Sequence, residues 1–163
     1  MNKKIKKVAL SALFAAMITA LTFFIKIPMG YGYFHIGDSV IYLAACILPT
    51  PYALMAAGIG GALADALGGY FIYIIPSMII KMLITLPYNA KSDVILTKRN
   101  IIMIIPASII TIVGYFGTAF VFYGWSGAFA GLFGDIIQVV GSAVLFIIIT
   151  CALDKINIKN MLS

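Results

Sequence analysis

Three ionisable side chains lie inside long apolar stretches of this sequence, where a charge is costly. Asp65, Lys81 and Asp135 each interrupt a run of hydrophobic residues. Ionisable groups inside membrane-spanning segments usually face the protein interior or an aqueous cavity, and they mark sites of binding or transport. These three residues are therefore the first candidates for a polar site within an apolar protein.

Asp135 and Lys81 differ in what they can reach. Asp135 lies nine residues into the run 126–153, too deep for a short carboxylate to reach water, and Gln138 extends the same polar face one turn inward. Two interpretations are open for the longer Lys81 side chain. It either reaches the nearer membrane surface or pairs inside the protein with Asp135, Asp65 or a bound substrate. We expect Lys81, Asp135 and Gln138 to contact a ligand, with a structural Lys81–Asp135 ion pair as the alternative.

Aromatic side chains near the ends of the last two apolar runs are candidates for stacking on a flat ligand. Tyr115 and Trp125 lie in this region, together with Tyr123. Tyrosine and tryptophan rings pack well on planar molecules, but they also anchor proteins at membrane interfaces. Both interpretations stay open for these residues.

Motifs for catalysis, nucleotide binding or metal binding are absent from the sequence. It has no GxxxxGK[ST], HExxH, CxxC or GxSxG pattern, and its single histidine cannot form a multi-histidine metal site. Cys46 and Cys151 lie in apolar runs and are expected to be inert thiols. We therefore predict no metal, no cofactor and no enzymatic activity.

The composition requires a membrane environment. Of 163 residues, 63% are hydrophobic and 10% are charged, whereas soluble domains carry about 25% charged residues. Since a span needs about 20 apolar residues, the chain has room for one all-α bundle of six transmembrane helices. The predicted spans form a single domain and cover residues 8–25, 38–48, 52–67, 71–88, 101–122 and 126–153.

The basic residues predict the orientation of this bundle. With six spans, nine of the Lys and Arg residues outside the membrane fall on one side and one, Lys26, on the other. Positively charged loops stay in the cytoplasm, so both termini and residues 89–100 are expected there. The clusters lie between apolar runs and form no basic helix face, which argues against nucleic-acid binding.

The second predicted span is short, at 11 residues or about 16 Å of helix. It is either a short helix before a tight turn at Pro49 and Pro51 or the first half of one long kinked helix. If short, it forces the preceding loop into the outer half of the protein, and irregular backbone at that depth must line a cavity or be buried. We expect this loop to roof an outward pocket to which Tyr33, His35 and Asp38 contribute, although an ordinary external loop is the alternative.

Small residues recur every four positions in the first and third runs. The row Ala12, Ala16 and Ala20 begins on the cytoplasmic side of the first run. Such rows let helix backbones approach closely. This row is either an internal packing seam or a docking surface for another membrane subunit, while the rows on 53–68 indicate internal packing.

Three segments of the sequence resemble the substrate-binding S components of energy-coupling factor (ECF) vitamin transporters, in particular the riboflavin and hydroxymethylpyrimidine-type branch. These segments are ALSALFAAMITA, KIPMGYGYFHIGDSVIYLAACILPTPYALMAAGIGGALADALGGY and IIPSMIIKMLITLP. The last two runs match only in length and character.

The resemblance implies a plasma-membrane subunit that captures a vitamin or precursor on its outer side. It further implies a transmembrane coupling subunit and two cytoplasmic ATPases that hydrolyse ATP, with Ala12 and Ala16 touching the coupling subunit. Two other classes stay open: a stand-alone secondary transporter, which would work without an ATPase, and a membrane enzyme, which would turn over a lipid or prenyl substrate alone.

Overall fold

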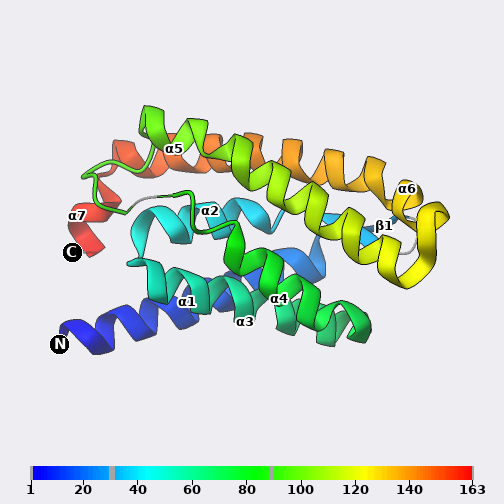
Figure 1. Cartoon of the computed structure of the whole chain (residues 1–163). Helices are drawn as coiled ribbons and strands as arrows, with labels where there is room; N and C mark the ends of the chain where they lie inside the picture. The colour runs from blue at the N-terminus through cyan, green and yellow to red at the C-terminus, as the bar shows by residue number, and fades with distance from the viewer. Residues whose placement is uncertain (1, 30–31, 89, 163) are drawn as a thin grey trace.

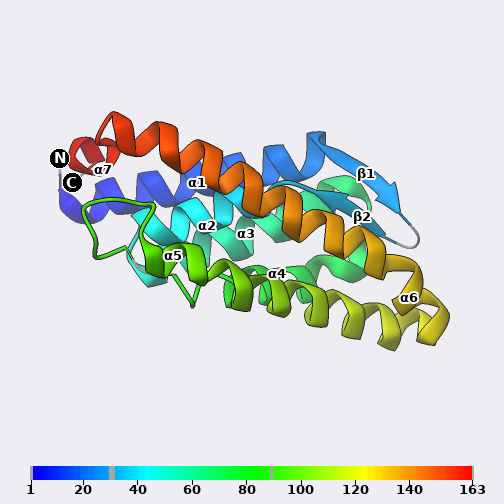
Figure 2. The same cartoon turned by 90° about the horizontal axis from the view of Figure 1, so that it is seen from above.

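The computed structural model describes residues 2–29, 32–88 and 90–162, most of them in helices. The elements in chain order are α1 (Lys3–Phe24), β1 (Lys26–Met29), β2 (Gly32–His35), α2 (Asp38–Ile47), α3 (Thr50–Gly68), η1 (Phe71–Tyr73), α4 (Ile74–Leu83), α5 (Lys98–Ile102), α6 (Ile104–Lys155) and α7 (Ile158–Leu162). They pack lengthwise into an elongated bundle (Figures 1 and 2).

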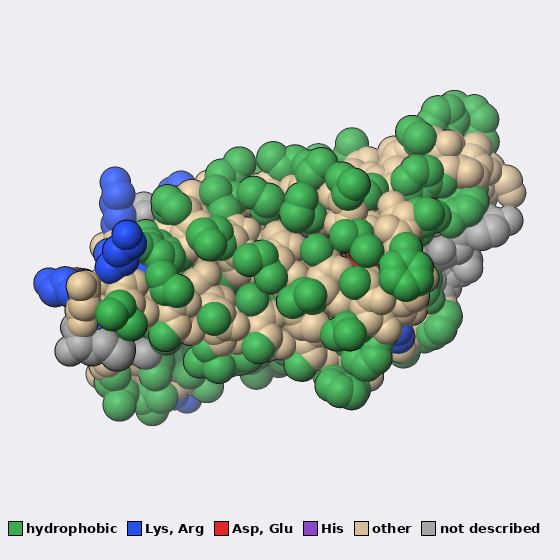
Figure 3. Space-filling view, turned by 90° about the horizontal axis from the view of Figure 1, so that it is seen from below, with side chains coloured by type: hydrophobic (Ala, Val, Ile, Leu, Met, Phe, Trp, Pro, Cys, Tyr) green, Lys and Arg blue, Asp and Glu red, His purple; other side chains and the backbone are tan. Residues whose placement is uncertain are grey.

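The two ends of the bundle differ in content. Both termini, α5 and α7 lie at one end, which we call the basic end, and the β-hairpin and the bend in α6 lie at the other, which we call the pocket end (Figure 1). Lys and Arg side chains gather at the basic end, while hydrophobic side chains cover the length of the molecule (Figure 3).

Helix α2 forms the centre of the bundle. Its residues 38–46 are all buried, as expected for a helix that is apolar on every side. Leu48 and Pro49 leave it in extended backbone, and α3 starts at Thr50 with Pro51 in its first turn. Of the two expected arrangements, the structure therefore has the short helix with a tight turn.

The small residues of α3 bring its neighbours into close contact, as predicted. A methyl group on Gly60 would lie 2.9 Å from the Ala15 carbonyl oxygen of α1. The Thr19 hydroxyl donates across this seam to the Gly60 carbonyl at 3.0 Å. On the other side of α3, a methyl group on Gly61 would lie 2.8 Å from the Lys81 side chain of α4, so α3 holds α1 and α4 together.

Helix α6 runs to the pocket end and back. Its one non-helical residue is Gly124, with φ of 67° and ψ of −166°, a conformation that glycine adopts without steric penalty. The expected runs 101–122 and 126–153 are thus two antiparallel arms joined by a single residue. Of residues 123–125, which lie between the two predicted runs, only Gly124 has non-helical backbone.

Among the described residues, two helical segments are long and apolar enough to cross a membrane, Lys3–Phe24 and Lys98–Lys155. Asp38–Ile47 and Phe71–Leu83 are shorter apolar helices. The run predicted over 71–88 loses its helix after Leu83, where the Thr85 hydroxyl bonds the Met82 carbonyl at 2.7 Å. Pro87 lies just beyond, and the residue before a proline is disfavoured in helical backbone.

Candidate functional site

The segment between α1 and α2 is a β-hairpin that reaches into the pocket end. Lys26 pairs with His35 and Pro28 with Tyr33 in antiparallel register; residues 30 and 31, within the predicted loop, lie outside the described residues. The Tyr33 hydroxyl donates to the Asp65 carboxylate of α3. The hairpin is therefore tied to the bundle by one of its own side chains.

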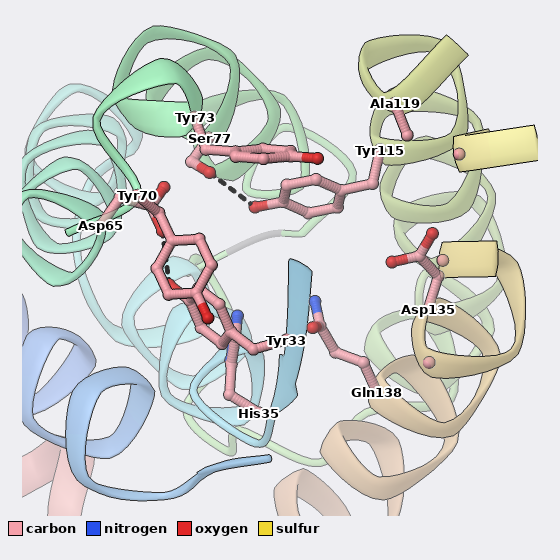
Figure 4. Close-up of a pocket in the computed structure, with 13 residues that line it drawn as sticks. Tyr33, His35, Asp65, Tyr70, Tyr73, Ser77, Tyr115, Ala119, Asp135 and Gln138 are labelled. Carbon is pink, nitrogen blue, oxygen red and sulfur yellow. Dashed lines mark hydrogen bonds between the residues drawn. The ribbon is translucent and has the colours of Figure 1, made fainter. Parts of the chain in front are cut away.

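Tyr33 and His35 line a pocket between the hairpin, α3, α4 and both arms of α6 (Figure 4). Together with its opening to solvent, it holds about 590 Å³ of space. Its lining residues are Tyr33, His35, Asp65, Tyr70, Tyr73, Ser77, Tyr115, Ala119, Gly127, Gly131, Gly134, Asp135 and Gln138.

Tyrosines form the aromatic walls of this pocket. The ring of Tyr33 lies 4.6 Å from that of Tyr70, centroid to centroid. Tyr115 faces them and donates its hydroxyl to Ser77 Oγ at 3.0 Å. Such rings offer flat apolar faces with polar edges, which suits a planar polar ligand.

Glycines on the second arm of α6 line the opposite wall, which is open at Gly131. Gly127, Gly131 and Gly134 all line the pocket, and a methyl group on Gly131 would meet no atom within 4 Å. Asp135 and Gln138 follow on the same face and point into the space (Figure 4). This wall therefore combines room for a ligand with polar groups.

Lys81 takes a partner that the sequence analysis did not name. Its ammonium lies 2.6 Å from Asp38 Oδ1, with the two side chains 2% and 0% exposed. The Gln138 amide nitrogen donates to Asp38 Oδ2 at 2.9 Å, and Lys81 Nζ lies 4.9 Å from the centroid of the Tyr115 ring. The expected pairing with Asp135 or Asp65 was wrong, as was the alternative in which Lys81 reaches the membrane surface.

This network joins α2, α4 and α6 beside the pocket. Lys81 and Asp38 are not among the pocket-lining residues, whereas Gln138 and Tyr115 are. Direct contact of Lys81 or Asp38 with a ligand stays a prediction. Asp38 accepts from Gln138, and Lys81 lies over the Tyr115 ring, so the pair contacts two of the lining side chains.

The remaining predicted site residues divide between pocket and surface. Tyr33, His35, Tyr115, Asp135 and Gln138 line the pocket. Trp125 does not; it is 63% exposed and packs against three phenylalanines of α6, Phe116, Phe120 and Phe129. That environment fits the interpretation of Trp125 as an interfacial anchor.

His35 enters the site as a neutral ring. Its Nδ1 accepts a hydrogen bond from the Gly37 N–H at 3.0 Å, which leaves the proton on Nε2. Burial and the nearby Lys81 charge lower the pKa of His35 to about 3. The histidine thus lines the pocket as a neutral ring and not as a cation.

Sequence reasoning missed Tyr70, Tyr73 and Ser77 as lining residues. Their spacing of three and four residues places them on one face across η1 and α4, a signal that was present in the sequence. Among the described residues, no three His, Cys, Asp or Glu side chains are grouped so that they could hold a metal ion.

These features define a class of protein: a helical, apolar molecule that encloses a small-molecule pocket between a hairpin and a helix bundle. The sequence matches the model of the ECF-type riboflavin transporter S component family over residues 2–155. The chain belongs to this family, and it is a transporter component and not an enzyme.

Two relatives cover most of the chain. A thiamine precursor transporter, HmpT, of Lactococcus lactis is 28% identical over 163 residues, covering 98% of this chain and 94% of that protein. An uncharacterized protein of Pyrococcus woesei is 30% identical over 140 residues, covering 80% and 88%. Family and relatives together support a vitamin-binding S component located in a membrane.

Proposed function

We propose that this chain is the substrate-capture subunit of an ECF-type importer of the cell membrane. It binds a vitamin or a related small heterocycle at its outer face and delivers it inward. The observation that carries the proposal is the pocket of about 590 Å³ whose walls are tyrosine rings and whose polar groups are Asp135, Gln138 and His35. The thiamine precursor named for HmpT is a ligand of the same type.

The orientation in the proposal rests on charge. In it, the helical segments form six spans with both termini in the cytoplasm. The basic residues of the N-terminal segment, α5 and α7 lie at one end of the bundle and the pocket at the other (Figures 1 and 3). The positive-inside rule then places the pocket toward the outside.

The partners in the proposal are a transmembrane coupling subunit and two cytoplasmic ATPases. Ala12, Ala16 and Ala20 are all exposed along one face of α1, while Phe14, Ala15 and Ile18 of the same helix are buried. A packing seam within this chain would bury the alanine row. An exposed row of small residues instead supports a docking surface for another membrane helix.

One purification tests capture and coupling together. The protein is produced in rich medium, alone and with the coupling subunit and ATPases of the same cell, and the denatured extract is analysed by mass spectrometry. We expect a stoichiometric heterocyclic vitamin or precursor, and uptake into proteoliposomes that requires all subunits and ATP. Uptake by the chain alone without ATP would contradict the proposal in favour of a secondary transporter.

A further inference from the structure

Exposed basic side chains gather at the basic end from three segments that lie far apart in the sequence (Figure 3). They are Lys3, Lys4 and Lys7 of α1, Lys91, Lys98 and Arg99 in and before α5, and Lys155 at the end of α6. Of the five acidic residues of the chain, only Asp93 is exposed. Asp154 at the same end already accepts from two backbone N–H groups. The exposed surface of this end is therefore strongly positive.

The chain itself does little to balance this charge. The carboxylate of Asp93 stands against seven exposed positive charges. Six of the basic residues form no salt bridge with a described residue: Lys3, Lys4, Lys7, Lys98, Arg99 and Lys155. The counter-charge therefore comes from outside the chain, either as mobile salt ions or as a fixed anionic partner.

The start of α1 pays an electrostatic cost for its lysines. The helix begins directly after Asn2, whose side-chain oxygen accepts from the Lys4 N–H at 3.0 Å, and its first turn has no acidic residue. Helix N-termini favour negative charge, and Lys3 and Lys7 lie one turn apart, where like charges repel each other. Local preferences are broken in this way mainly where a function compensates for the loss. An anionic partner would replace both repulsions with attraction.

Apolar side chains beside the basic residues favour a lipid surface as that partner. Ile5 and Val8 of α1 are 58% and 52% exposed, and Ile102 and Ile156, next to the other two basic segments, are 56% and 57% exposed. In a membrane such side chains face acyl chains, while lysine stems lie along them and hold the ammonium groups at the level of the headgroups. A soluble anionic partner would leave these apolar side chains uncovered.

We infer that the basic end binds the headgroups of anionic phospholipids, with Lys3, Lys4 and Lys7 of α1 as its main contacts. A headgroup such as phosphatidylglycerol carries a net negative charge, whereas phosphatidylcholine carries the same phosphate together with a cation. Each basic residue close to an anionic lipid surface strengthens binding about 5-fold, and salt screens the attraction. This interaction is independent of the molecule that the pocket binds.

Native mass spectrometry of the full chain in a neutral detergent tests the inference. The protein is mixed with equal amounts of phosphatidylglycerol and phosphatidylcholine that have identical acyl chains. We expect phosphatidylglycerol adducts to exceed the others at least about 10-fold, and this preference should fall as the ionic strength is raised. The triple variant Lys3→Gln, Lys4→Gln, Lys7→Gln should lose most of the preference. Lys26→Gln, a loss of the same charge at the pocket end, should keep it, and Asp93→Asn should increase it.

Thermal unfolding of the same proteins separates lipid binding from a structural role. In neutral detergent the triple variant should have the same or a higher midpoint than the parent, because its lysines have no salt-bridge partner among the described residues. A lower midpoint there would overturn the inference, as would equal adducts of the two lipids on the parent. A triple variant that keeps the lipid preference but no longer co-purifies with the coupling subunit would also overturn it, since the lysines would then bind protein.

Discussion

Two carboxylates on the same helix have opposite surroundings at the two ends of the molecule. At the basic end, Asp154 Oδ1 accepts from the Ile95 N–H and Oδ2 from the Leu96 N–H, both at 2.8 Å. At the pocket end, Asp135 makes no hydrogen bond or salt bridge with a described residue and interacts only with the charges of Lys81 and Asp38. Residue type and helix are the same, so the difference lies in what the tertiary structure brings to each carboxylate.

The basic end is closed by its own polar groups. Besides the Asp154 contacts, Lys159 Nζ donates to the carbonyl oxygens of Ala90 and Ser92 at 2.9 and 2.6 Å. These bonds fasten the connection between α4 and α5 to the end of α6 and to α7. Polar groups that satisfy one another stabilise a fold, whereas polar groups left open in a cavity are available to a ligand.

The largest expected effect tests whether a satisfied network at the pocket end is structural. Lys81→Met leaves Asp38 buried with Gln138 as its hydrogen-bond donor. Removing one partner of a buried pair costs about 3–5 kcal/mol, and we expect this loss in the free energy of unfolding of the purified protein. Adding Asp38→Asn removes the orphaned charge and should restore part of it. A variant as stable as the parent would show that the pair is dispensable.

The next prediction compares a glycine in a tightly packed contact with a glycine that borders open space. Gly60→Leu places atoms against the Ala15 carbonyl and Ile18 at 2.9 Å, and overpacking of this kind costs about 1–3 kcal/mol. Gly131→Leu enters open space, so the thermal midpoint should stay near that of the parent. The amount of co-purified ligand should nevertheless fall at least about 10-fold, since the leucine occupies the pocket. The reverse pattern would place the ligand outside this pocket.

An effect of similar size on stability is expected at the basic end. Asp154→Ala leaves the Ile95 and Leu96 amides without their acceptor, a loss of about 1–3 kcal/mol. Hydrogen exchange at residues 90–97 should accelerate, while ligand content stays at the level of the exposed-site control Asp93→Ala. If Asp154→Ala loses ligand while hydrogen exchange at residues 90–97 is unchanged, the basic end takes part in binding, and the division into a structural end and a binding end is wrong.

The smallest effect on stability is expected on the exposed face of α1. Ala16 is exposed, so Ala16→Leu should change the free energy of unfolding by no more than about 0.5 kcal/mol. Its bulk should still keep a partner helix from close approach, and we expect loss of co-purification with the coupling subunit. The buried neighbour Ala15→Leu is the contrast, because it should destabilise the chain itself. If Ala16→Leu still co-purifies with the coupling subunit, the docking surface lies elsewhere on the chain.

Much of the architecture could be predicted because membrane helices are encoded locally. Apolar runs and the prolines at 49 and 51 gave the short α2 as one of two alternatives, and the spacing of small residues indicated the tight packing around α3. The hairpin was predicted only as a loop roofing a pocket, since β pairing depends on partners that a short segment does not specify. The single-residue turn at Gly124 was missed because a glycine at positive φ looks like any other in a sequence.

The sequence by itself determined an apolar helical protein, the clusters of basic residues between its apolar runs and the polar residues within those runs. Only the tertiary structure decided how those residues pair: Lys81 with Asp38, Asp65 with Tyr33, and Asp135 in no hydrogen bond or salt bridge with a described residue. The physical reason is that pairing across helices depends on the relative rotation and depth of the helices. A lysine that lies 43 positions from its aspartate in the sequence gives no local signal of that arrangement. The open carboxylate thus follows from the packing.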